Sequence, residues 1–180
     1  MIVVNSREEL RELINQRIEE RGPNCDLNDI DVSGITDMSF IFYKTDFNGD
    51  ISEWDTSNVK DMSWMFYGSL FNGDISKWNV SNVKNMSRMF CGADFNGNIS
   101  GWNVSNVENM SWMFAYSHFN GDISKWNVSC VENMGSMFRG SEFCGDLSKW
   151  DVSKVENMSY IFFCSPLYDH EPEWWFRHRE

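Results

Sequence analysis

Hydrophobic residues return at fixed places along most of this chain. The segment that begins at Phe47 reads FNGDISEWDTSNVKDMSWMFYGSL, and a more divergent copy, PNCDLNDIDVSGITDMSFIFYKTD, begins at Pro23. The same order of residues restarts at Phe71, Phe95, Phe119 and Phe143. Six copies of 24 residues therefore run without insertion from residue 23 to residue 166. A fixed period of this length is typical of solenoids, in which one repeat cannot bury its apolar face alone.

The first half of a copy predicts a strand. Ile75-Ser-Lys-Trp-Asn-Val80 has the L-x-x-L-x-L spacing of leucine-rich repeats and follows the turn dipeptide Asn72-Gly73. We expect Ile75, Trp78 and Val80 to point inward from a short strand over residues 75 to 80.

The second half of a copy changes to a helical period, because Val83, Met86, Met89 and Phe90 recur at three- and four-residue steps. Ser105 and Glu108 have the spacing of a capping box at the start of such a helix. The sequence therefore predicts an α/β repeat solenoid, leucine-rich-repeat-like, with a short strand and a short helix or 3-10 segment in each of six coils. A strand through residues 83 to 86 is the rival assignment.

Both ends of the repeat carry segments that could cover it. Ser6-Arg-Glu-Glu9 is a capping box, and the helix it opens would end near Gly22-Pro23. Its apolar stripe consists of Leu10, Leu13, Ile14 and Ile18. We divide the chain into an N-terminal strand and helix cap (1–22), six coils (23–166) and a C-terminal aromatic cap or tail (167–180). The pair Trp174–Trp175 closes the last coil or, alternatively, docks a partner.

Little in the composition indicates chemistry. Five of the nine Trp share one repeat position, and every Met except Met1 falls at one of two others, which indicates core ladders rather than a cofactor or metal box. The five Cys have no CxxC pair and the three His are scattered, so we predict reduced thiols, no metal site, no cofactor and no catalytic residues. The chain is expected not to be an enzyme. Asp50, Asp74 and Asp122 could line a Ca²⁺ ladder, but Asn98 interrupts them, and turn capping is the simpler interpretation.

Charge narrows the class of partner. The formal net charge of −12 argues against direct contact with nucleic acid or an anionic membrane, and it favours solubility or a basic partner. No segment has the length of a membrane span or the pattern of a signal peptide. A cytoplasmic monomer is the expectation from these features.

The motif FNGDISxW[ND]VSNVxNMSxMF resembles the BspA-like bacterial surface-protein repeat, a relative of the leucine-rich repeats, and the resemblance covers all six copies. It implies a right-handed solenoid of bacterial origin that contacts other proteins and performs no chemistry. It also implies a cell-surface or secreted location, although this chain has no export signal.

Positions at which the copies differ are where a partner could be recognised. We number the repeat so that Pro23 and Phe47 occupy position 1. Positions 14, 18 and 21 would lie opposite the apolar stripe of the predicted helix. Positions 18 and 21 are rich in Trp, Tyr and Arg, the residues common in binding hot spots. The predicted partner-binding residues are Phe40, Trp64, Tyr67, Arg88, Trp112, Arg139 and Tyr160. The alternative is that these side chains only complete the convex surface.

A second hypothesis about function comes from position 14. Glu108, Glu132 and Glu156 begin a row of carboxylates along the rod, as in an acidic DNA mimic that inhibits a nucleic-acid-binding protein. Lys60 and Lys84 interrupt that row. The main hypothesis is therefore a non-catalytic solenoid that binds another protein.

Overall fold

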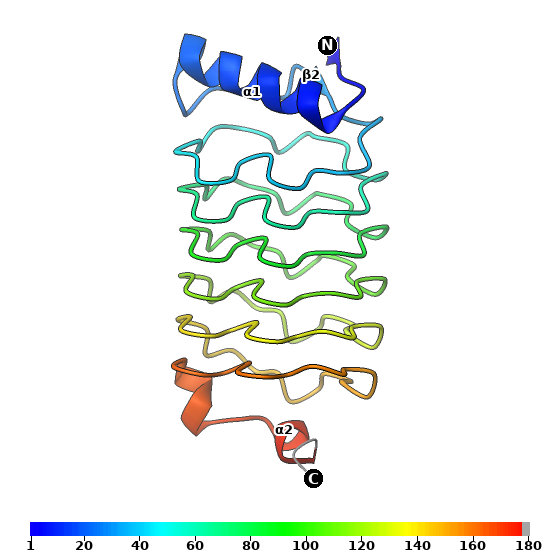
Figure 1. The fold of residues 1–180 in the computed structure, drawn as a ribbon, viewed down its shortest axis with the longest axis vertical. Coiled ribbons are helices and arrows are strands. Elements are labelled where there is room, and N and C mark those ends of the chain that lie inside the picture. Colours follow the sequence, from blue (N-terminus) through cyan, green and yellow to red (C-terminus); the bar gives the residue numbers. More distant parts are fainter. Residues whose placement is uncertain (178–180) are drawn as a thin grey trace.

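The structure, a computed structural model, describes residues 1–177 of the chain. Its regular elements lie at the two ends (Figure 1). They are β1 (Ile2–Val3), α1 (Arg7–Arg21), β2 (Ile30–Asp31), the 3-10 helix η1 (Pro166–Asp169) and α2 (Glu173–Arg177). Between β2 and η1 the chain winds as coils stacked on one another, and residues 32–165 contain neither a helix nor a paired strand.

Residues 24 apart in sequence lie beside each other in the stack. Single parallel bridges join Asp37 to Asp61, Asp61 to Asn85 and so on, up to Asn133 and Asn157. At the N-terminal end, β1 pairs in parallel with β2, with Ile2 opposite Ile30. The 24-residue period of the sequence thus matches the spacing of neighbours along the stack.

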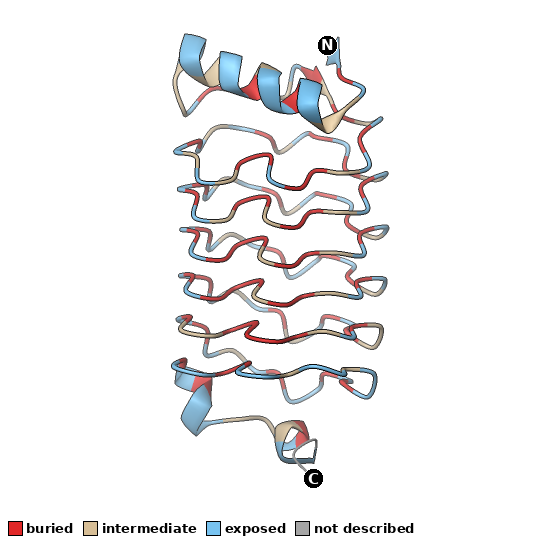
Figure 2. Ribbon diagram, viewed as in Figure 1, coloured by how far each residue is buried: buried red, intermediate tan, exposed pale blue. Residues whose placement is uncertain are grey.

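The core consists of ladders in which one residue type repeats from coil to coil (Figure 2). Phe66 and Phe90 stack at 5.5 Å between ring centroids, and Trp54 and Trp78 at 6.3 Å. Each ladder Trp donates its indole N–H to a backbone carbonyl of the preceding coil, as Trp78 does to Ile51 at 3.0 Å. The prediction that the repeated Trp and Met residues are buried is confirmed for all five tryptophans and for every methionine from Met38 to Met137.

The predicted strand over residues 75–80 is wrong, although its inward residues Ile75, Trp78 and Val80 are buried. Two features replace it. The backbone N–H of Trp78 donates to the carbonyl of Ile75, which closes a turn. The side chain of Asp74 accepts from the backbone N–H of Ser76. The carbonyl of Ile51 accepts from the indole N–H of Trp78. It is therefore not available to a backbone N–H in a regular ladder between extended strands. Local side-chain bonds have displaced the strand.

The predicted helix over residues 83–90 and its capping boxes are also wrong. Overlapping four-residue turns occupy this part, as between Met86 and Met89 and between Arg88 and Cys91. Arg88 has a φ of 57°, which no right-handed helix permits. The N–H of Glu108 donates to Lys84 of the preceding coil at 2.8 Å and is not bonded to Ser105. The alternative prediction, a strand through residues 83 to 86, was closer, because Asn85 forms parallel bridges with the neighbouring coils.

Backbone pairing between coils follows one rule along the stack. The N–H groups at positions 16, 18, 20 and 22 donate to carbonyls at positions 15, 17, 19 and 21 of the next coil, and we call these four N–H groups the donor row. From the second coil on, the N–H groups at positions 19, 21 and 23 bond within their own coil, as Met65 does to Met62. Every donor row therefore points toward the C-terminal end.

Two positions in each coil have left-handed backbone. All six residues at position 18 and all six at position 22 have φ between 53° and 63°. They are the third residues of turns such as 62–65 and 66–69, where a type II turn requires a positive φ. Position 22 is glycine in three coils, whereas position 18 never is.

Gly92 isolates the energetic cost of this backbone conformation, since nothing lies within 4 Å of a Cβ added there. We expect Gly92→Ala to lower the free energy of unfolding by about 1–2 kcal/mol, the strain of a left-handed L-residue. Gly92→Asn should lose less, because asparagine tolerates this region. Urea denaturation of the two variants checks both values, and equal losses would contradict the assignment of the cost to φ.

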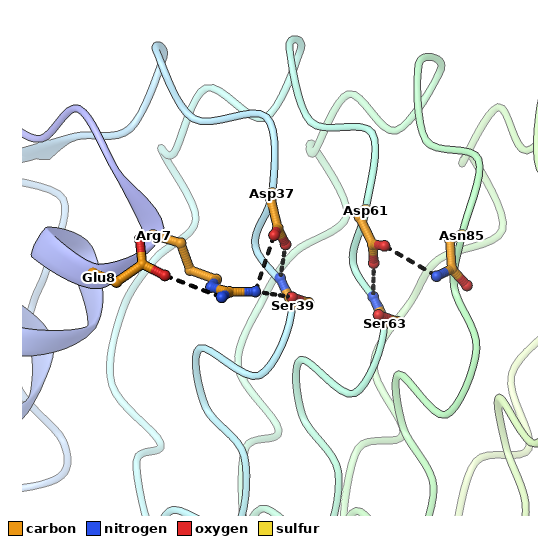
Figure 3. Close-up of polar contacts among 7 residues, drawn as sticks. All are labelled: Arg7, Glu8, Asp37, Ser39, Asp61, Ser63 and Asn85. Atoms are coloured by element: carbon orange, nitrogen blue, oxygen red, sulfur yellow. Dashed lines mark hydrogen bonds and ion pairs between the residues drawn. The ribbon is translucent and has the colours of Figure 1, made fainter.

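The N-terminal helix forms where the sequence predicts it, but Glu9 accepts from the N–H of Asn5 and not from that of Ser6, so only half of the capping box is present. Ser6 accepts from the N–H of Glu9 at 3.1 Å, and α1 ends at Arg21 before Gly22. Its buried residues Leu10 and Ile14 lie in the same core cluster as the first coil. Figure 3 shows Arg7, at the first turn of α1, donating to Asp37 and to Ser39 of that coil. Asp61 and Asn85 continue the row from Asp37, joined by a bond of 3.0 Å.

The C-terminal cap continues the repeat, which our sequence division missed. Leu167 is buried at the Phe position, and Trp174 lies 24 residues after Trp150. Trp174 donates its indole N–H to Leu147 at 2.7 Å, as each ladder Trp does to the residue 27 positions earlier. Residues 167–177 are thus a partial seventh copy, in which Leu167 and Trp174 are buried against the last full coil. Residues 178–180 of the predicted cap lie outside the described part.

Candidate aromatic–arginine interface

The seven predicted partner-binding residues lie along one row of the stack. All seven occupy position 18 or 21 of successive coils. Arg139, at position 21 of the fifth coil, bridges Trp112 and Tyr160, because position 18 of that coil is Ser136. The structure adds Tyr43 and Phe163 to the row. We call these nine residues the aromatic–arginine strip: Phe40, Tyr43, Trp64, Tyr67, Arg88, Trp112, Arg139, Tyr160 and Phe163.

The N-terminal half of the strip is a cluster of four rings. Phe40 stacks on Trp64 at 5.5 Å, and Tyr43 stacks on Tyr67 at 5.2 Å. Trp64 and Tyr67 lie 4.7 Å apart at a tilt of 40°. Lys44 places its ammonium 5.4 Å from the Tyr43 ring. The faces of these rings are in contact with one another, which leaves mainly the ring edges for solvent or a partner.

The C-terminal half alternates arginine with aromatic rings. Arg88 lies between Trp64 and Trp112, with its guanidinium carbon 4.6 Å and 5.4 Å from the two ring centroids. Arg139 lies between Trp112 and Tyr160, at 5.5 Å and 5.6 Å. Each such pair contributes about 0.5–1 kcal/mol where it is solvent-exposed. The strip is therefore continuous from the first coil to the last.

The strip is half-buried and not fully exposed. Tyr160 is 63% exposed and Phe40 38%, whereas Trp64, Arg88 and Trp112 are intermediate. The helical argument for outward direction fails at several sites, since Cys91, Ala115 and Ser136 at the same positions are buried. Left-handed backbone at position 18, which the sequence did not reveal, sets where these side chains emerge.

The strip contains two arginines and no carboxylate, whereas the chain as a whole has a net charge of −12. Among the described residues, neither Arg88 nor Arg139 forms an ion pair with a carboxylate. Their stacked guanidiniums leave the N–H edges for an external acceptor. A cavity of about 410 Å³ lies beside Arg88, and its lining includes Trp112, Tyr160 and two small residues of the fifth coil, Gly135 and Ser136.

The acidic row at position 14 is partly neutralised. Lys84 donates to Glu108 at 2.7 Å, and the bond raises the pKa of the lysine. The glutamates of this row that no described lysine pairs with are Glu132 and Glu156. This observation weighs against the DNA-mimic hypothesis, which needs an uninterrupted row of carboxylates.

The Asp50, Asp74 and Asp122 series serves the turns. Each carboxylate accepts from the N–H of the serine two residues later, at 2.9 Å in all three. These bonds with serine hold the pKa of each carboxyl below its usual range. Asn98 makes the same contact with Ser100. In residues 1–177 no cluster of three His, Cys, Asp or Glu side chains suited to a metal ion is found.

Cys91 is not activated as a nucleophile. In the described chain all five are free thiols, and burial raises the pKa of Cys91 to about 11. A thiol with that pKa is protonated at neutral pH and is a poor nucleophile.

Neither α1 nor α2, the α-helices of the described chain, is long and apolar enough to cross a membrane.

A known family matches the chain twice, over residues 10–118 and over residues 93–177. The chain belongs to the Mycoplasma protein family of unknown function DUF285. The two DUF285 matches overlap in the middle of the stack, which fits a chain whose coils repeat one sequence. No curated protein and no solved structure matches the chain.

Proposed function

We propose that this DUF285 protein is a leucine-rich-repeat-like solenoid that performs no catalysis and binds another protein through the aromatic–arginine strip. The continuity of the strip carries the proposal. Rings and guanidiniums follow one another along the stack, although the coil fold itself does not require aromatic residues at position 18, as Ser136 demonstrates.

Left-handed backbone strengthens this argument. A bulky L-residue with φ near 60° costs about 1–2 kcal/mol relative to a relaxed conformation. Trp64, Trp112 and Tyr160 are held there at φ of 59°. Glycine would relieve the strain, as it does at position 22 in three coils. Strain of this kind is concentrated at functional sites.

The chemistry of the strip favours a partner surface that carries carboxylates between apolar groups. Arg88 and Arg139 offer bidentate donors, and Trp112 between them offers an apolar edge. The partner thus matches the local cationic charge of the strip rather than the net charge of −12. Intramolecular stacking occupies the ring faces, which leaves little room for the base stacking that single-stranded nucleic acid would need.

Replacing Trp64 and Trp112 together by alanine should abolish capture of the partner, because the strip loses both of its tryptophans, a residue type that dominates binding hot spots. The immobilised chain and the variant are exposed to lysate of the host organism, and retained proteins are identified by mass spectrometry. A second variant, Arg88→Gln with Arg139→Gln, should weaken the same capture by about tenfold or more through lost charge-assisted bonds.

Leu70→Ala with Lys125→Ala is the matched control, since both residues are exposed and lie outside the strip. It should retain the captured protein. Circular dichroism and thermal denaturation establish that all variants are folded. Capture that survives in the Trp64 and Trp112 variant would show that the strip is surface packing and not an interface.

A further inference from the structure

The sixth coil carries a donor row that no described residue matches. In each of the first five coils, all four N–H groups of the donor row reach carbonyls of the next coil at 2.8–3.1 Å. In the sixth coil the corresponding groups belong to Met158, Tyr160, Phe162 and Cys164. None of these four has a backbone or side-chain acceptor among the described residues.

The described residues of the partial seventh copy do not cover this row. Residues 167–177 correspond to positions 1–11, and they cover the Phe and Trp ladders through Leu167 and Trp174. Positions 15–21 supply the carbonyls at every inner interface, and the described residues of the seventh copy stop short of them. The edge is therefore donor-only over four alternate residues.

A hollow lies over the open row. A cavity of about 480 Å³ is lined by Tyr160, Phe162, Phe163, Tyr168 and Trp175, with Glu171 also on its wall. Phe163 meets Tyr168 edge to face at 6.3 Å, and Phe162 meets Trp175 in the same way at 5.7 Å. Aromatic walls over a row of N–H donors combine apolar contact with backbone hydrogen bonding.

The polarity of the row decides what can occupy it. A second copy cannot pair through the same edge, because N–H groups would face N–H groups. The opposite end of another copy carries the matching carbonyls at Asp37, Ser39, Ile41 and Tyr43, but α1 lies across that coil and Arg7 is bonded to Asp37 and Ser39 (Figures 1 and 3). Two C-terminal edges therefore cannot pair with each other, and α1 obstructs stacking of one copy on the N-terminal end of another.

We infer that the C-terminal edge of the stack binds a polypeptide segment of a partner protein, which adds as one further row. Its alternate carbonyls accept from Met158, Tyr160, Phe162 and Cys164, and one of its apolar side chains enters the aromatic hollow. The five inner interfaces support this occupant, since a segment of the type Asn-Met-Ser-x-Met-Phe covers each donor row there. Addition of a chain to an open edge is a general mode of peptide recognition.

A synthetic peptide tests the inference on the full chain. The acetylated and amidated peptide ENMGSMFRGS copies residues 132–141, which cover the donor row of the fourth coil, and it contains no Trp. Amide hydrogen exchange is followed residue by residue by NMR. Without peptide, the four edge amides should exchange faster than those of Met110, Trp112, Phe114 and Tyr116, which are bonded. With peptide, exchange at the four edge amides should slow by about tenfold or more.

Three comparisons make the result decisive. A peptide of the same composition in scrambled order should give no protection, and glutarate at the same concentration should give none either. Equal protection by glutarate would replace the proposed peptide with a simple anion. Edge amides that stay unprotected at saturating peptide, or that are already protected without it, would overturn the inference. The Trp64 and Trp112 alanine variant should bind the peptide normally, because neither tryptophan belongs to the edge or lines its hollow, although the strip and the edge meet at Tyr160 and Phe163.

Discussion

Phe90→Ala should lower the free energy of unfolding by about 3–5 kcal/mol, the range for removing a buried Phe. The ring is fully buried and lies 5.5 Å from Phe66, 5.8 Å from Phe114 and 4.3 Å from Phe95. Its loss opens a cavity in the middle of the stack, where coils on both sides depend on it. Chemical denaturation followed by Trp fluorescence measures the change.

Phe163→Ala is the matched control, since that ring is 40% exposed at the last coil. We expect it to lower the free energy of unfolding by about 1 kcal/mol or less, because little apolar surface is lost from the core. Similar losses for the two variants would mean that the phenylalanine ladder does not carry the stability assigned to it here.

Gly49→Ala should lower the free energy of unfolding by about 1–3 kcal/mol, the usual cost of overpacking. A Cβ at residue 49 would lie 1.9 Å from the carbonyl oxygen of Cys25, which is backbone and cannot rotate away. That carbonyl also accepts from the N–H of Asp50 at 3.2 Å. The substitution therefore separates the first coil from the second.

Gly101→Ala is expected to have the opposite sign. Nothing lies within 4 Å of a Cβ at Gly101, and its φ is not in the left-handed region. Alanine there restricts the unfolded chain and should raise the free energy of unfolding by about 0.4–1 kcal/mol. Thermal denaturation of the two glycine variants side by side would show the contrast, and a loss in both would contradict the account of Gly49.

The period of the sequence predicted which residues become neighbours, and their apolar character predicted burial. Trp54 and Trp78, or Met62 and Met86, could be assigned to ladders without a structure. The conformation within a coil could not be predicted in this way. The spacing of Val83, Met86, Met89 and Phe90 suits a helix, but the same residues also point inward from a series of turns, and hydrophobic spacing does not distinguish the two.

The residues of the strip could be named from sequence, but their arrangement could not. Variation at position 18 identified Trp64 and Trp112, whereas nothing in the sequence indicated that Arg139 occupies the place vacant at Ser136. Three glycines at position 22, in the second, third and fifth coils, were the available signal for left-handed backbone. Trp174 could also have been found, since it keeps the spacing of the Trp ladder.

Asn48, Asn72 and Asn96 each accept, through the side-chain oxygen, from the N–H of the residue 24 positions later, and the donor rows repeat in the same way. Every inner interface is thus nearly interchangeable with its neighbours. Gain or loss of a whole coil by recombination within the gene would join surfaces that already fit. The contacts of α1 with the first coil and of Trp174 with the last would stay the same. The length of the protein is therefore free to vary during evolution in steps of one coil, and the span of its binding strip varies with it.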